Sequence, residues 1–184
     1  MYMKSFLLFP GLLIAIFASA QSGNTEVKWL THMDSAFNMS IEYPSDWQLK
    51  PPTKNARFFI TSYPESDKDN FRENLNCIIP SDIQKGNTMQ MVEEDIVKTL
   101  SESLPDFKII HSGYSQWNNV SAYEIEYTCT QTSNDVTFYL HMLQKVAIIR
   151  GKLYALTYTS LTDAYEKYIG TVRRMFESFK VLQK

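Results

Sequence analysis

Long apolar runs are nearly absent from this sequence of 184 residues, and the longest one lies at the start of the chain. Residues 6–17 carry no charge, but a membrane-spanning helix needs about 20 apolar residues, so this run is too short to be an anchor. Lys4 precedes the run and the small residues Ala18-Ser19-Ala20 follow it, which is the pattern of a cleavable secretory signal. We therefore predict a signal peptide over residues 1–20 and a single exported domain over residues 21–184, either periplasmic or secreted.

Glycine and cysteine are also scarce, with six and two residues. The sequence has no glycine-rich phosphate loop, no G-x-S-x-G turn of a hydrolase and no C-x-x-C pair. Cys77 and Cys129 both fall on the apolar faces of expected strands. Two cysteines in an exported chain invite a disulfide, whereas two buried free thiols are the alternative. The sequence leaves both readings open.

Neither sign of charge dominates. The 18 Lys and Arg residues against 20 Asp and Glu residues give a formal net charge of −2 at pH 7. Nucleic acids and anionic membrane surfaces are bound through basic stripes or clusters. We therefore expect neither kind of partner.

Side chains of the types that bind metals or act in catalysis are scattered along the sequence. The loop at residues 65–70 holds three carboxylates, but it lacks the central glycine of a calcium loop, and Lys68 offsets its charge. Glu124 and Glu126 share one face of an expected strand, where solvation is the ordinary explanation unless a helix covers that side. The histidines lack the i, i+4 partner of a helical zinc site. The histidines are His32, His111 and His141. We expect no catalytic residue, no metal and no cofactor, and hence no enzyme.

Two segments show the three- and four-residue apolar spacing of amphipathic helices. Asn87 with Gln90 resembles a capping box before the first, and Ser160 or Thr162 can cap the second. The two stripes are Met89, Val92, Ile96, Leu100 and Leu104, and Tyr165, Ile169, Val172, Phe176 and Phe179.

The rest of the chain reads mostly as strands. Residues 45–47 read as a turn, and short connections containing glycine or asparagine favour antiparallel hairpins. Helices and an antiparallel sheet must bury their apolar faces on one another, which predicts an α+β fold, an α/β sandwich. The expected strands cover residues 27–32, 39–43, 57–63, 74–79, 107–111, 122–130, 136–149 and 153–159.

Six segments in this order resemble the PsbP-like domain family, which includes DcrB-like exported bacterial proteins. The resemblance implies an antiparallel sheet packed with helices and a role in docking or stabilisation rather than catalysis. Nothing in the sequence suggests photosynthesis, so that role is not carried over. The segments are Phe37 to Trp47 with its Tyr-Pro-x-x-Trp ending, Phe71 to Asn76, Leu104 to Phe107, Ala122 to Thr128, Tyr154 to Thr159, and Ser178 to Lys180.

Two functions are compatible with these observations. The leading hypothesis is a non-enzymatic, exported binding or assembly-support protein with a protein partner in the cell envelope. Tyr114 and Trp117 are its candidate contact residues, with Trp117 expected at an exposed hairpin tip. The alternative is a carrier of a small molecule or lipid in a cavity between sheet and helix.

Overall fold

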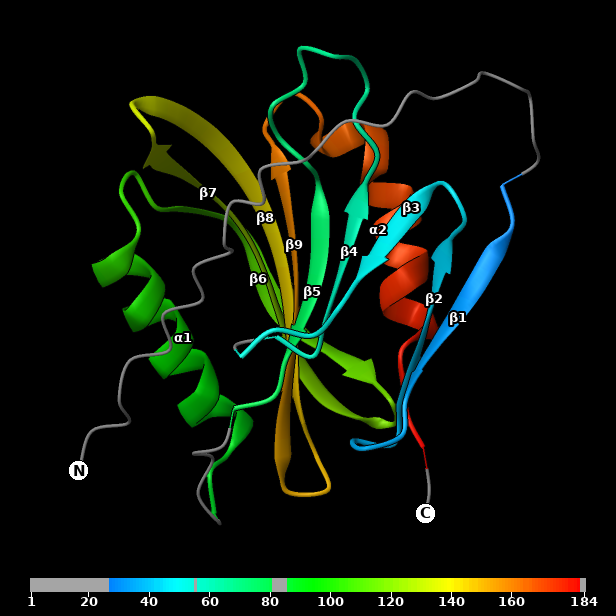
Figure 1. The fold of residues 1–184 in the computed structure, drawn as a ribbon. Helices are drawn as coiled ribbons and strands as arrows, with labels where there is room; N and C mark the ends of the chain where they lie inside the picture. Colours follow the sequence, from blue (N-terminus) through cyan, green and yellow to red (C-terminus); the bar gives the residue numbers. More distant parts are fainter. Residues whose placement is uncertain (1–26, 55, 81–85, 183–184) are drawn as a thin grey trace.

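A computed structural model describes residues 27–54, 56–80 and 86–182 (Figure 1). These residues form a three-stranded sheet of order β1-β2-β10 and a seven-stranded sheet of order β3-β4-β5-β9-β8-β7-β6, with all strand pairs antiparallel. The elements are β1 (Trp29–Asp34), β2 (Met39–Pro44), β3 (Trp47–Lys50), β4 (Phe58–Ser62), β5 (Asn74–Ile78), α1 (Met89–Ser103), β6 (Lys108–Trp117), β7 (Val120–Ser133), β8 (Val136–Ile149), β9 (Lys152–Leu161), α2 (Tyr165–Ser178) and β10 (Lys180–Val181).

Strands β6 to β9 form a meander because three two-residue turns connect them. Both residues of each turn have positive φ, the conformation of the tight hairpin turns that follow the twist of the strands. Asparagine, aspartate and glycine tolerate this conformation best. The turns are Asn118-Asn119, Asn134-Asp135 and Arg150-Gly151.

The two helices cover opposite faces of the seven-stranded sheet. Val92 and Leu100 of α1 belong to one buried cluster with Ile125, whereas Val172 and Phe176 of α2 belong to another. In Figure 1, α1 lies at one side of the sheet, and α2 lies towards the other side, behind β3 and β4 and near β2. The predicted α+β sandwich of the PsbP-like kind is therefore confirmed.

Several local predictions differ from the structure. Ser45 and Asp46 turn the chain as predicted, but the turn ends before Trp47, which begins the unpredicted strand β3 and packs into the core under α2. Thr88 rather than Asn87 caps α1, since its side chain accepts a hydrogen bond from the Met91 amide at 3.3 Å. Helix α2 begins after Ala164 with no side-chain cap.

The predicted signal peptide over residues 1–20 lies outside the described residues. In the described ranges, neither helix has the length and apolarity that crossing a membrane requires.

Candidate functional site

A surface groove of about 980 Å³ runs between α1 and β6. Strand β6 contributes Tyr114 to its lining, and this side chain is 52% exposed. The Tyr114 hydroxyl donates a short hydrogen bond to the Glu93 carboxylate. That bond raises the pKa of Tyr114 to about 12, so the hydroxyl remains a donor at neutral pH. The groove is lined by Gln90, Glu93, Glu94, Val97, Lys98, Ser101 and Tyr114.

Strand β6 forms a long open edge of the sheet beside this groove. It pairs with β7 and, within the described ranges, with no other strand. Ile109 and Ile110, near the start of β6, are exposed, and the register shift after Ile109 makes Ile110 a bulge. An edge strand leaves backbone N–H and C=O groups unpaired, which suits it to accept another strand. The opposite edge, β3, has four residues against the ten of β6.

The prediction that Trp117 is exposed at a hairpin tip is wrong, because Trp117 is 6% exposed. Its indole Nε1 donates to the Phe176 carbonyl oxygen at 2.9 Å, and its ring stacks on Phe179 with centroids 5.0 Å apart. The turn residue Asn118 binds the Phe179 carbonyl and the Val181 amide. The hairpin end is therefore fixed under the end of α2. Of the two candidate contact residues, Tyr114 alone lies at the surface.

Of the two readings left open for Cys77 and Cys129, the structure has the pair of buried free thiols. Cys77 belongs to the cluster under α2 and Cys129 to the cluster under α1, on opposite faces of the sheet, and both are free thiols. The alternation of residues along each strand placed each cysteine on an apolar face, but it could not show which of the two faces of the sheet this was. Burial raises the pKa of Cys77 strongly and that of Cys129 to about 11, so both remain thiols at neutral pH.

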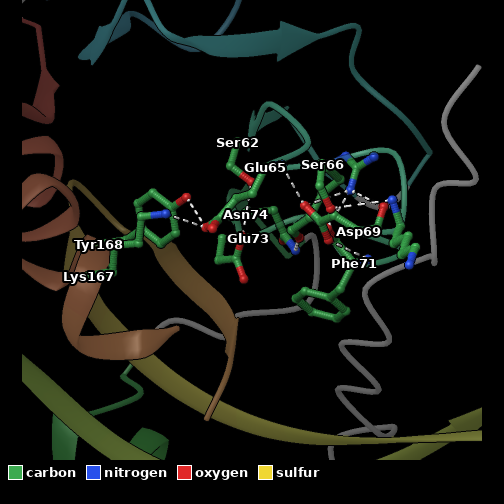
Figure 2. Close-up of polar contacts among 11 residues, drawn as sticks. Ser62, Glu65, Ser66, Asp69, Phe71, Glu73, Asn74, Lys167 and Tyr168 are labelled. Atoms are coloured by element: carbon green, nitrogen blue, oxygen red, sulfur yellow. Dashed lines mark hydrogen bonds and ion pairs between the residues drawn. The ribbon is translucent and has the colours of Figure 1, made fainter. Parts of the chain in front are cut away.

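Two carboxylates of the acid-rich loop between β4 and β5, those of Glu65 and Asp69, have polar partners in the structure (Figure 2). Asp69 accepts hydrogen bonds from the amides of Glu65 and Phe71 and pairs with Arg72 at 3.1 Å. Glu65 contacts Lys167 of α2 at 2.6 Å. Hydrogen bonds to Glu65, first from Lys167, lower the pKa of its carboxyl. The loop is thereby fastened to α2.

Glu73 follows this loop and is buried against Ser62, whose hydroxyl donates to it at 3.1 Å (Figure 2). Burial raises the pKa of Glu73. A carboxyl in this position is a candidate acid or base, but its described polar contacts are few and it faces the core under α2.

The strand carboxylates Glu124 and Glu126 form a charged cluster beside α2. Lys145 contacts Glu124 at 3.1 Å, and His141 contacts Glu126 at 2.8 Å. Arg173 of α2 lies between them, 3.4 Å from Glu124 and 4.0 Å from Glu126. The second helix, rather than the first, covers this side of the sheet, and each acid has a basic neighbour.

The histidines do not assemble. His141 stacks on Tyr165, and His32 packs edge-on against Phe58, where burial lowers its pKa. His111 lies on the exposed part of β6. Across the described ranges, no group of three or more histidine, cysteine or acidic residues could hold a metal ion.

Sequence reasoning missed a further polar group on the opposite, α1-facing side of the sheet. Four oxygen atoms there are buried without a hydrogen-bond partner among the described residues. The signal was present as asparagine, threonine and glutamine at positions of central strands that ordinarily carry apolar side chains. The atoms are Oδ1 of Asn74 and Asn76, Oε1 of Gln144 and Oγ1 of Thr159.

Solved structures share this fold at low sequence identity. Cyanobacterial PsbP (CyanoP) from Synechocystis is 21% identical with a TM-score of 0.59, covering 89% of this chain and 98% of that one. LpqN of Mycobacterium tuberculosis, described as involved in cell envelope biogenesis, is 15% identical with a TM-score of 0.53, covering 87% and 94%. The Ran-binding protein Mog1p of Saccharomyces cerevisiae is 7% identical with a TM-score of 0.55, covering 85% and 96%.

Among curated proteins, none matches this chain in sequence. The PsbP-like protein family matches residues 16–181, nearly the whole chain, and the chain therefore belongs to that family.

Proposed function

We propose that this chain is an exported, non-enzymatic binding protein that supports an assembly in the cell envelope. Its protein partner adds an extended segment to the open edge of β6. The single observation that carries the proposal is this ten-residue edge strand with one neighbour, exposed Ile109 and Ile110, and a groove beside it. Backbone pairing would supply affinity, and the groove would receive side chains of the added segment.

Two further observations support this proposal. LpqN, which shares the fold, is described as involved in cell envelope biogenesis. Three of the carboxylates are engaged in the fold: Glu124 and Glu126 in ion pairs, and Glu65 in the contact with α2. A nucleophile with a positioned base, which covalent catalysis needs, is not among these groups.

The test is affinity capture of the mature protein from the envelope of its own host, compared with the variant Ile110→Lys. A lysine at an edge opposes strand addition, so we expect capture of the partner to fall about tenfold or more. Tyr139→Lys is the matched control, because Tyr139 is 68% exposed on β8, which has a strand on both sides. Equal capture by Ile110→Lys and the wild type would rule out the β6 edge as the docking surface.

A second candidate function, a small-molecule carrier, is favoured by one observation, the buried unpaired oxygens on the α1-facing side of the sheet.

A further inference from the structure

The groove beside β6 lies where the side chains of an added strand would point. Ile109, Ser112 and Tyr114 pair with β7 residues of the cluster under α1, so these three side chains face α1. Helix α1 runs opposite to β6, because a short connection joins them and Tyr114, late in β6, reaches Glu93, early in α1. A strand added about 4.8 Å beyond β6 would therefore direct alternate side chains into the groove, along the flank of α1.

The end of this groove next to Tyr114 is acidic. Glu93 accepts a hydrogen bond from the Tyr114 hydroxyl, and Glu94 accepts one from a side-chain amide of α1 at 3.1 Å, so both donors are neutral. Neither carboxylate has an ion-pair partner among the described residues. The lysine of the lining, Lys98, lies 4.0 Å from Glu102. Two negative charges therefore face an incoming strand without a cationic partner in the described part of the chain.

The basic side chains of β6 point away from the groove. Lys108 and His111 pair with Thr128 and Glu126 of β7. Glu126 lies on the α2-facing side of the sheet, 4.0 Å from Arg173 of α2. Lys108 and His111 therefore face that side too, and they leave the charge of the groove uncompensated.

The other end of the groove is less polar. Val97 lies about one helical turn beyond Glu93, and Ser101 follows one turn later. Ile109, 38% exposed, faces α1 near the start of β6. Because α1 and β6 run in opposite directions, an added strand would meet acids near Tyr114 and mainly apolar side chains near Ile109.

A second copy of this chain does not suit this charge pattern. Pairing of two β6 edges would bring the α1 of the second copy to the same groove. Helix α1 has an excess of acids, and like charges brought together oppose association. A segment with positive charge would instead find unpaired negative partners. The charged residues of α1 are Glu93, Glu94, Asp95, Lys98 and Glu102.

We propose that the segment added to β6 is basic on its α1-facing side. It places lysine or arginine beside Glu93 and Glu94, and an apolar side chain beside Val97 and Ile109. This inference rests on the proposed docking at β6 and specifies the chemistry of the partner. Backbone pairing with β6 supplies most of the affinity, while the exposed charge pairs select the segment.

The test is the binding of three short synthetic peptides to the mature protein, measured by fluorescence anisotropy of a label on the peptide. Threonine alternates with isoleucine in one half of each peptide, and with lysine, glutamine or glutamate in the other half. Each peptide is made in both orders, to cover parallel and antiparallel addition. We expect the lysine peptide to bind about fivefold more tightly than the glutamine peptide at low salt, and about tenfold or more tightly than the glutamate peptide. This advantage should shrink as added salt screens the charges.

Two double variants and one single variant locate the contact. Glu93→Gln with Glu94→Gln keeps the hydrogen-bond acceptors but removes both charges, so the lysine peptide should lose its advantage. Glu166→Gln with Glu177→Gln is the matched control, because it makes the same charge change at exposed positions of α2. It should leave the advantage intact. Ile110→Lys at the strand edge should weaken all three peptides.

Four outcomes would overturn the proposal. Equal binding of the three peptides, all weakened by Ile110→Lys, would remove the basic segment and leave docking at β6 intact. An advantage of the lysine peptide that survives the loss of Glu93 and Glu94 would place the basic contact elsewhere. Binding of none of the peptides would also reject the basic segment, and capture with Ile110→Lys would then decide on the edge separately. A dimer of the mature protein that Ile110→Lys abolishes would assign the edge to a second copy.

Discussion

The two faces of the seven-stranded sheet are built from the same strands but differ in the middle. Under α2, the central positions carry Leu143, Leu156 and Tyr158, and a compact aromatic core closes over them. Under α1, the central positions carry the polar side chains of Asn76, Thr157 and Gln144. Apolar residues such as Ile125 lie on β7, closer to the helix. Both faces hold buried polar atoms without a partner among the described residues, but under α2 these atoms include the hydroxyls of the aromatic residues Tyr158 and Tyr165.

The largest expected effect comes from removing a core ring on the α2 face. Phe176→Ala deletes a side chain that is 3% exposed, and we expect a loss of about 3–5 kcal/mol in the free energy of unfolding. Leu100→Ala on the α1 face removes fewer atoms at 8% exposure, so its loss should fall nearer about 2–3 kcal/mol. Urea unfolding of both variants measures the difference.

A loss of unfolding free energy in Leu100→Ala that equals or exceeds the loss in Phe176→Ala would contradict the expected difference between the two faces. It would show that α1 and the face beneath it contribute as much to stability as α2 does.

A smaller effect is expected from the buried carboxyl on the α2 face. Burial raises the pKa of Glu73, so the folded state favours its protonated form. That contribution to stability is complete below the ordinary pKa of a free glutamate and is lost as the pH rises through the raised pKa. Glu73→Gln cannot ionise and still accepts from Ser62, so its stability relative to the wild type should increase from acidic to neutral pH.

The measurement is urea unfolding of wild type and variant across this pH range, with the exposed Glu177→Gln as control. A stability difference between Glu73→Gln and wild type that does not change with pH would contradict the raised pKa of the buried Glu73 carboxyl.

Much of the fold follows from periodicity in the sequence. The spacing of Val172 and Phe176 predicts the buried stripe of α2, and the 136–149 strand is observed at its predicted bounds. Strand β3 was not predicted because a four-residue strand after a proline carries too little alternation to separate it from a turn. Periodicity also shows which residues of one strand share a face, but it does not show which helix covers that face. Parity therefore placed Cys77 and Cys129 on apolar faces without showing that these faces are opposite ones.

The candidate site was less predictable than the fold. Tyr114 could be nominated from its residue type, but its place beside α1 depends on how that helix packs across the sheet. The polar side chains on the α1-facing side, such as Asn76 and Thr157, lie side by side because β5 pairs with β9. These strands are far apart in sequence, and no local pattern encodes their pairing. The polar side chains become noticeable only when the register aligns them.

The smallest expected effect concerns Tyr114, compared with Trp117 three residues further along the same strand. Trp117→Phe removes the indole N–H that binds the Phe176 carbonyl in the α2 core, which leaves a buried acceptor unpaired and should cost about 1–3 kcal/mol. Tyr114→Phe removes an exposed hydroxyl that binds Glu93 over the groove, and its effect on stability should stay within about 0.5 kcal/mol. Urea unfolding of the two variants gives both values. A loss in Tyr114→Phe as large as that in Trp117→Phe would mean that Tyr114 holds α1 onto the sheet, and the groove would then be a structural contact rather than a surface open to a partner.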